Sequence, residues 1–134
     1  MSTYSKFQTD AALELNGITL DLGEAGRFVI ARAGGANKKF AKRFAELTKP
    51  YRRAIQTETL SEEIGSKLLR QVYIETVLLS WDGVTDENGE KLTFTSGNAE
   101  KLFSDLPWLF EEIRRTAEDA AIFRTVVQEA DAKN

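Results

Sequence analysis

The sequence predicts a mainly α-helical protein with a small β element, an α+β fold forming one compact domain over residues 1–134. Two observations support this class. Apolar and polar residues alternate only near the N-terminus, whereas from residue 37 onward apolar residues recur every three or four positions, as on one face of a helix. The length of 134 residues and the hydrophobic content of 42% suit one core. We therefore expect an N-terminal β-hairpin followed by about four helices.

The β-hairpin is expected over residues 18–32. Ile18, Leu20 and Leu22 alternate with polar residues, residues 23–26 (GEAG) supply a turn, and a second apolar-rich run follows. Because an isolated hairpin is only marginally stable in water, we expect this one to pack on helices or to gain another strand.

A basic amphipathic helix is expected over residues 37–49. Its apolar stripe has helical spacing and consists of Phe40, Phe44, Leu47 and Tyr51. We expect the Asn37 side chain to cap this helix, and we expect the helix to end or kink at Lys49 because Pro50 follows. Lys38 and Lys39 oppose the helix dipole at this start, so an acidic group is expected nearby.

A central core helix is expected over residues 59–80. Thr59 and Glu62 have the spacing of a capping box, and the run from Ile74 to Leu79 is almost wholly apolar. The polar residues 86–90 then predict a turn, and residues 91–95 predict a short strand.

Two further helices complete the predicted fold. A short helix is expected over residues 98–105, with Ser96 as its cap. A C-terminal helix is expected over residues 107–130, because Pro107 suits a first helical turn and because Leu109, Ile113 and Ala117 form one stripe.

The composition argues against several classes of function. The chain has no Cys and no His, so it lacks thiolate and imidazole groups for catalysis or metal binding. We therefore expect no enzyme, no catalytic residue, no cofactor and no metal site. No apolar stretch reaches the roughly 20 residues that a membrane helix needs, and residues 1–10 lack the apolar part of a signal peptide. We expect a soluble intracellular protein.

The charges divide the chain into two parts. Residues 27–56 carry nine Lys or Arg and one Glu, a net charge of +8, whereas residues 57–134 carry eight basic and sixteen acidic residues, a net charge of −8. Such a division favours an acidic partner for the basic segment, an intramolecular contact, or a homo-oligomer in which the basic region of one copy meets the acidic region of the next.

Residues 34–40 (GGANKKF) raise the question of a phosphate site. They lack the glycine, lysine and hydroxyl order of a P-loop, which argues against a nucleotide. Nucleic acid is the stronger alternative because the basic segment could neutralise several phosphates. The acidic pI of about 5.1 and the lack of an aromatic platform for stacked bases disfavour it.

The order and spacing of several motifs resemble a known family. They are residues 17–32 (GITLDLGEAGRFVIAR), NKKF at residues 37–40, the Lys49–Pro50 pair, residues 79–107 (LSWDGVTDENGEKLTFTSGNAEKLFSDLP) and a closing helix with Phe123. Over about Gly17 to Phe123, this pattern is similar to the tail assembly chaperones of lambdoid-type long-tailed bacteriophages.

The resemblance implies a late viral protein of the host cytoplasm that acts without catalysis. Such a chaperone coats the phage tape-measure protein, keeps it soluble, recruits tail-tube protein and is absent from the finished tail. A frameshifted longer form of the chain is also implied, since residues 132–134 (AKN) could be encoded by a slippery run. The remaining alternatives are a small nucleic-acid-binding or regulatory protein and a structural tail subunit.

The expected partner-binding residues are the cations and apolar side chains of the basic helix and a few aromatic residues outside it. Partners of this kind are bound through helix-in-groove contacts with charged rims. The candidates are Lys38, Lys39, Phe40, Lys42, Arg43, Phe44, Leu47, Tyr51, Arg52, Arg53, Trp81, Phe103, Trp108 and Phe110.

Overall fold

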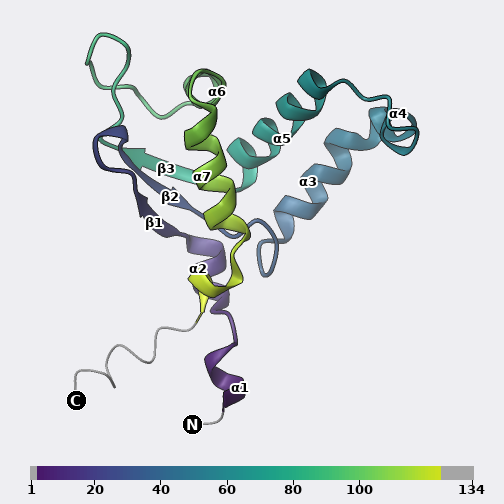
Figure 1. Cartoon of the computed structure of the whole chain (residues 1–134). Helices are drawn as coiled ribbons and strands as arrows, with labels where there is room; N and C mark the ends of the chain where they lie inside the picture. The colour runs from purple at the N-terminus through teal and green to yellow at the C-terminus, as the bar shows by residue number, and fades with distance from the viewer. Residues whose placement is uncertain (1–2, 125–134) are drawn as a thin grey trace, which may run out of the picture.

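The computed structural model describes residues 3–124 and confirms the α+β class, with helices around a small sheet (Figure 1). The helices are α1 (Thr3–Lys6), α2 (Ala11–Asn16), α3 (Lys38–Thr48), α4 (Arg52–Gln56), α5 (Glu62–Thr76), α6 (Ser96–Asp105) and α7 (Pro107–Glu118). The strands are β1 (Ile18–Asp21), β2 (Arg27–Ile30) and β3 (Leu78–Asp82), and 3₁₀ turns occupy Gly23–Ala25, Lys49–Tyr51 and Ala120–Phe123.

The sheet is antiparallel, with the strand order β1-β2-β3. β1 and β2 form the expected hairpin, in which Ile18 lies opposite Ile30. β3 pairs with β2 and supplies the additional strand that a marginal hairpin needs. Phe28 and Ile30 are fully buried, whereas Thr19 is exposed, so one face of the sheet carries the core.

The prediction of one helix over residues 59–80 is wrong at both ends. α5 begins at Glu62 because Ser61 is its cap, accepting a hydrogen bond from the Ile64 amide at 3.2 Å. The helix ends at Thr76, and the apolar run continues as β3. A short apolar run fits a buried helix or a buried strand equally well, and here the open edge of β2 selects the strand.

The predicted strand at residues 91–95 is also wrong, because these residues make only an isolated bridge between Thr85 and Lys91. The next helix, α6, begins at residue 96 instead of 98. Its cap is Thr95 and not Ser96, since the Thr95 hydroxyl accepts a hydrogen bond from the Asn98 amide at 3.1 Å.

The C-terminal helix is shorter than the predicted 107–130. α7 ends at Glu118, and the Asp119 carboxylate accepts a hydrogen bond from the Ala121 amide at 2.9 Å, which caps the following 3₁₀ turn. Residues 125–130 of the predicted helix lie outside the described residues.

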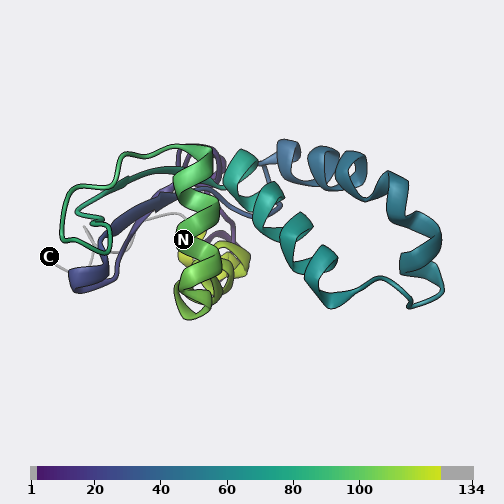
Figure 2. The same cartoon turned by 90° about the horizontal axis from the view of Figure 1, so that it is seen from above.

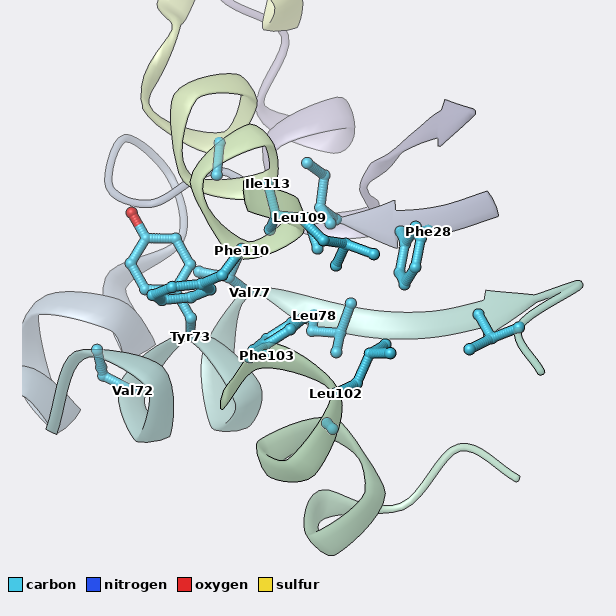
Figure 3. Close-up of a cluster of buried hydrophobic side chains, with 14 residues drawn as sticks. Phe28, Val72, Tyr73, Val77, Leu78, Leu102, Phe103, Leu109, Phe110 and Ile113 are labelled. Atoms are coloured by element: carbon cyan, nitrogen blue, oxygen red, sulfur yellow. The ribbon is translucent and has the colours of Figure 1, made fainter. Parts of the chain in front are cut away.

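The core lies between the buried face of the sheet and helices α5, α6 and α7 (Figure 3). Aromatic rings join these helices. The Tyr73 and Phe110 rings meet edge to face with centroids 5.5 Å apart, and the Phe103 and Phe110 centroids are 4.9 Å apart. Such pairs add to the stabilisation from buried area.

Helices α3, α4 and α5 form an arm that extends away from the sheet and from α6 and α7 (Figures 1 and 2). We use the term arm for residues 38–71, which leaves out the last turn of α5, where Val72, Tyr73 and Thr76 are buried in the body, and we call the end of the arm beside that turn its root. The basic helix expected over residues 37–49 is α3, which ends at Thr48, and a 3₁₀ turn at Lys49–Tyr51 leads into α4. α3 packs mainly against α5, so the arm is a two-helix hairpin with α4 at its tip.

Candidate partner-binding surface

The arm contains no buried residue, although it carries large apolar side chains. Phe44 on α3 is 42% exposed, Ile55 on α4 is 42% exposed and Ile64 on α5 is 39% exposed. Two packed helices bury only the seam between them, so apolar side chains beside the seam stay in contact with water. The arm therefore offers an apolar surface that one more helix could cover.

Three of the four residues of the predicted stripe are partly buried, and only Phe44 is exposed. At the root of the arm, the Phe40 ring meets the Tyr73 ring edge to face at 5.5 Å and stacks on Phe44 at 6.2 Å. Phe40 and Leu47 pack against the core, and Tyr51, which follows α3, is partly buried. Most of the stripe therefore holds the arm together, and Phe44 is its open part.

Most predicted cations of the arm are free of acidic partners. Arg43 is the exception, because its Nε and Nη2 donate to the two Glu75 carboxylate oxygens at 2.9 and 3.3 Å. In the described part of the chain, the other predicted cations are exposed and have no salt bridge; they are Lys38, Lys39, Lys42, Arg52 and Arg53. An intramolecular complement therefore accounts for only one of these charges.

The cations and the apolar stripe lie on different sides of α3. At about 100° per residue, Lys38 and Lys42 fall on the side opposite Phe40 and Leu47. The arm therefore has a basic outer side and an apolar seam with open margins, and these two surfaces can attract and then hold an amphipathic partner that carries negative charge.

Two of the predicted contact residues are wrong. Phe103 is 1% exposed and Phe110 is 7% exposed, and both belong to the core, where they pack on each other. Their helical spacing could not separate a core stripe from a surface stripe. Trp108, next to them in sequence, is 51% exposed and remains available.

Trp81 has a structural role in addition to its partial exposure. Its indole Nε1 donates a hydrogen bond to the Leu92 carbonyl at 2.9 Å, and its ring meets the rings of Phe28 and Phe94 edge to face. It therefore ties the loop at residues 83–95 to the sheet.

A buried polar network at the root of the arm has no counterpart in the sequence-based prediction. The Glu14 carboxylate, 3% exposed, accepts hydrogen bonds from Arg32 Nη1 at 3.1 Å, from Thr9 Oγ1 at 3.2 Å and from the Ala36 amide at 3.3 Å. Its bond to the Ala36 amide brings a carboxylate close to the start of α3, but its ion pair is with Arg32, and none with Lys38 or Lys39 is found among the described residues. Nothing in the sequence around Glu14 indicates this role.

The expectation that the Asn37 side chain caps α3 is wrong. Asn37 is 4% exposed, and its Nδ2 donates to the Arg32 carbonyl at 2.8 Å and to the Thr76 carbonyl at 2.9 Å. The side chain therefore faces the body and links the end of β2 to the end of α5. The Asn37 side chain thus pairs two backbone carbonyls that would otherwise be buried without a partner, and it makes no capping bond to α3.

Tyr73 links the end of α5, at the root of the arm, to the end of α7. Its hydroxyl donates a hydrogen bond to Glu118 Oε1 at 3.0 Å. Burial, reinforced by the negative charge of Glu118, raises the pKa of Tyr73 well above its ordinary value. The hydroxyl is thus a neutral donor near physiological pH.

Among residues 3–124, no group of three or more acidic side chains is placed to hold a metal ion. Over the same residues, no helix combines the length and apolar character needed to cross a membrane.

Comparison with known proteins decides the origin of the chain. Residues 35–134 match the family described as YdaY prophage protein, a stretch that begins just before α3 and includes the whole arm. The chain belongs to this family. It is therefore phage-derived, as the resemblance in its motifs implied. No curated protein and no solved structure matches the chain.

Proposed function

We propose that this prophage-family protein is a tail assembly chaperone that binds the tape-measure protein, keeps it soluble and recruits tail-tube protein before leaving the tail. It acts in the host cytoplasm and without catalysis. The observation that carries the proposal is the arm, a two-helix hairpin of large apolar and cationic side chains without one buried residue.

The shape of the arm supports a helical client. A third helix laid along one margin of the α3–α5 seam would cover an exposed apolar side chain such as Phe44 and would complete a small bundle. A tape-measure protein consists of long helices whose apolar faces would otherwise associate with one another. Covering these faces reversibly is what a chaperone for such a protein has to do.

The charge of the arm supports a client with acidic flanks. The unpaired cations of α3 would attract such a client, and Lys39, which lines the margin of the α3–α5 seam beside Glu75, would meet a carboxylate next to the apolar stripe of the client. A chaperone must also release its client, and rim charges in water give modest affinity and fast exchange. A frameshifted longer form would bring tail-tube protein to the same client.

Co-expression with the tape-measure protein of the same prophage tests the proposal. We expect the chain to keep the tape-measure protein in the soluble fraction and to co-purify with it. The proposal fails if the tape-measure protein remains insoluble and the chain purifies alone.

Two further measurements separate the alternatives. Proteomics of mature virions should find no copy of the chain, since its presence there would identify a structural tail subunit. A gel-shift assay with duplex DNA should show no binding at physiological salt. Tight binding whose affinity falls steeply as salt rises would instead identify a nucleic-acid-binding protein that uses the same cations.

A further inference from the structure

A groove lies between the loop at residues 83–95 and helix α6, away from the arm. Its volume is about 480 Å³, and its lining combines leucines with charged side chains: Thr85, Asp86, Glu87, Leu92, Asn98, Lys101, Leu102, Asp105 and Leu106. A groove of this kind can bind an apolar side chain on the leucines and charged groups at its rim.

The groove is acidic. Its charged lining consists of three carboxylates and Lys101, a net charge of −2. Lys101 Nζ lies 2.7 Å from Glu87 Oε1 and 2.8 Å from Asp105 Oδ2, which leaves part of each carboxylate unmatched. Asp86 Oδ1 accepts hydrogen bonds from the Asn88 and Glu90 amides, so Asp86 also shapes the loop.

Helix α4 has the complementary composition. Ile55 is 42% exposed, and Arg52 precedes it by three residues, which places both on one side of the helix. Arg53 is also exposed, and neither guanidinium has a salt bridge within the described residues. α4 thus presents an apolar anchor and the unpaired cation Arg52 on one side, with Arg53 on the other side.

The groove and α4 lie at opposite ends of the molecule. Both views show the loop at residues 83–95 on the far side of the sheet from the arm, with α4 at the arm's tip (Figures 1 and 2). One copy therefore cannot place its α4 in its own groove. Contact between unlike surfaces of two copies is heterologous and leaves one free α4 and one free groove at the ends.

We propose that α4 of one copy docks in the acidic groove of the next, with Ile55 on the leucines and Arg52 beside Glu87 and Asp105, while Arg53 on the other side of the helix adds only long-range attraction. A five-residue helix in one groove makes a contact smaller than a standard interface, so pairing between free copies is weak and salt-sensitive. The contact leaves Phe44 and the α3–α5 seam open for a client.

Cysteine cross-linking tests the contact directly, because the chain has no Cys of its own. Gln56→Cys places a thiol on α4 beside the intact Ile55, and Thr85→Cys places one in the groove lining. Under mild oxidation, we expect an equimolar mixture of the two variants to give one disulfide-linked dimer. A chain carrying both substitutions should give a ladder of multimers.

The matched control is Ser104→Cys, an exposed position on α6 that does not line the groove. Mixed with Gln56→Cys, it should cross-link roughly tenfold less than Thr85→Cys does, because the contact orients the thiols. Equal yields for the two partners would overturn the proposal. So would a ladder whose yield does not fall between about 50 mM and about 500 mM salt.

Charge reversal separates a specific contact from loss of folding. Arg52→Glu on the α4 partner, or Glu87→Lys with Asp105→Lys on the groove partner, should each reduce the cross-link about tenfold or more, since like charges then face each other. Combining the two reversed partners should restore it. Failure of the combination to restore the cross-link, with both variants folded by circular dichroism, would refute the docking.

Discussion

Replacing Asn37 by alanine is expected to destabilise the fold strongly, although the side chain is small and lies in a loop. Asn37 is 4% exposed and donates to the Arg32 and Thr76 carbonyls. The substitution removes two hydrogen bonds of about 1 kcal/mol each, and it leaves the Thr76 carbonyl buried without that partner at a further cost of about 1–2 kcal/mol. The free energy of unfolding should therefore fall by about 3–4 kcal/mol.

Urea denaturation followed by tryptophan fluorescence measures this loss, and a thermal melt should show a decrease in Tm of about 4 °C per kcal/mol. The matched control is Asn98→Ala, whose Nδ2 donates to the Thr93 carbonyl at 2.8 Å in an exposed setting. This control should lose less than about 1 kcal/mol because water can replace the bond. If the two variants lost the same stability, the bridging role of Asn37 would be refuted.

Two further predictions concern the core and the hairpin turn. The pKa of Tyr73 is raised in the folded state, so unfolding above the ordinary tyrosine pKa of about 10 releases a proton. The free energy of unfolding should therefore fall as pH rises above about 10, by up to about 1.4 kcal/mol per pH unit relative to Tyr73→Phe. If the free energies of unfolding of the two proteins changed in parallel with pH, this prediction would be contradicted. Gly26 has φ +116°, and an added Cβ would lie 2.7 Å from Val84 Cγ2, whereas Gly23 has φ +65° and open space. Gly26→Ala should therefore cost more than about 2 kcal/mol and Gly23→Ala about 1 kcal/mol in the same denaturation assay, and equal costs would show that the contact with Val84 is not limiting.

Local sequence signals were sufficient for the hairpin and the basic helix. Alternation and a glycine-rich turn predicted β1 and β2, and a four-three-four spacing with a following proline predicted α3 and its end near Lys49. These signals act through neighbouring residues, so no knowledge of the tertiary fold is needed.

The remaining features depend on contacts between distant segments. The run at residues 74–79 became a strand after Thr76 because β2 had an open edge, and Asn37 faces the body because the end of α5 lies beside it. The same limit applies to the candidate surface. Phe44 and Phe110 both belong to helical apolar stripes, and only the fold shows that Phe44 is exposed and Phe110 buried.

The proposed function requires that the arm hold a helical client through its exposed apolar side chains. The most direct measurement is the affinity of the purified chain for a tape-measure segment, by isothermal titration calorimetry, with Phe44→Ser and Ile64→Ser combined. Burying what is exposed of either side chain should contribute about 1 kcal/mol, so the double variant should bind roughly fivefold to thirtyfold more weakly.

The matched control is Leu15→Ser on α2, which removes an apolar side chain that is 50% exposed but lies outside the arm. We predict that this control binds the tape-measure segment with unchanged affinity, while the arm variant binds it more weakly. Unchanged affinity of a folded arm variant, or an equal loss of affinity in the Leu15→Ser control, would refute the proposal that the arm holds the client.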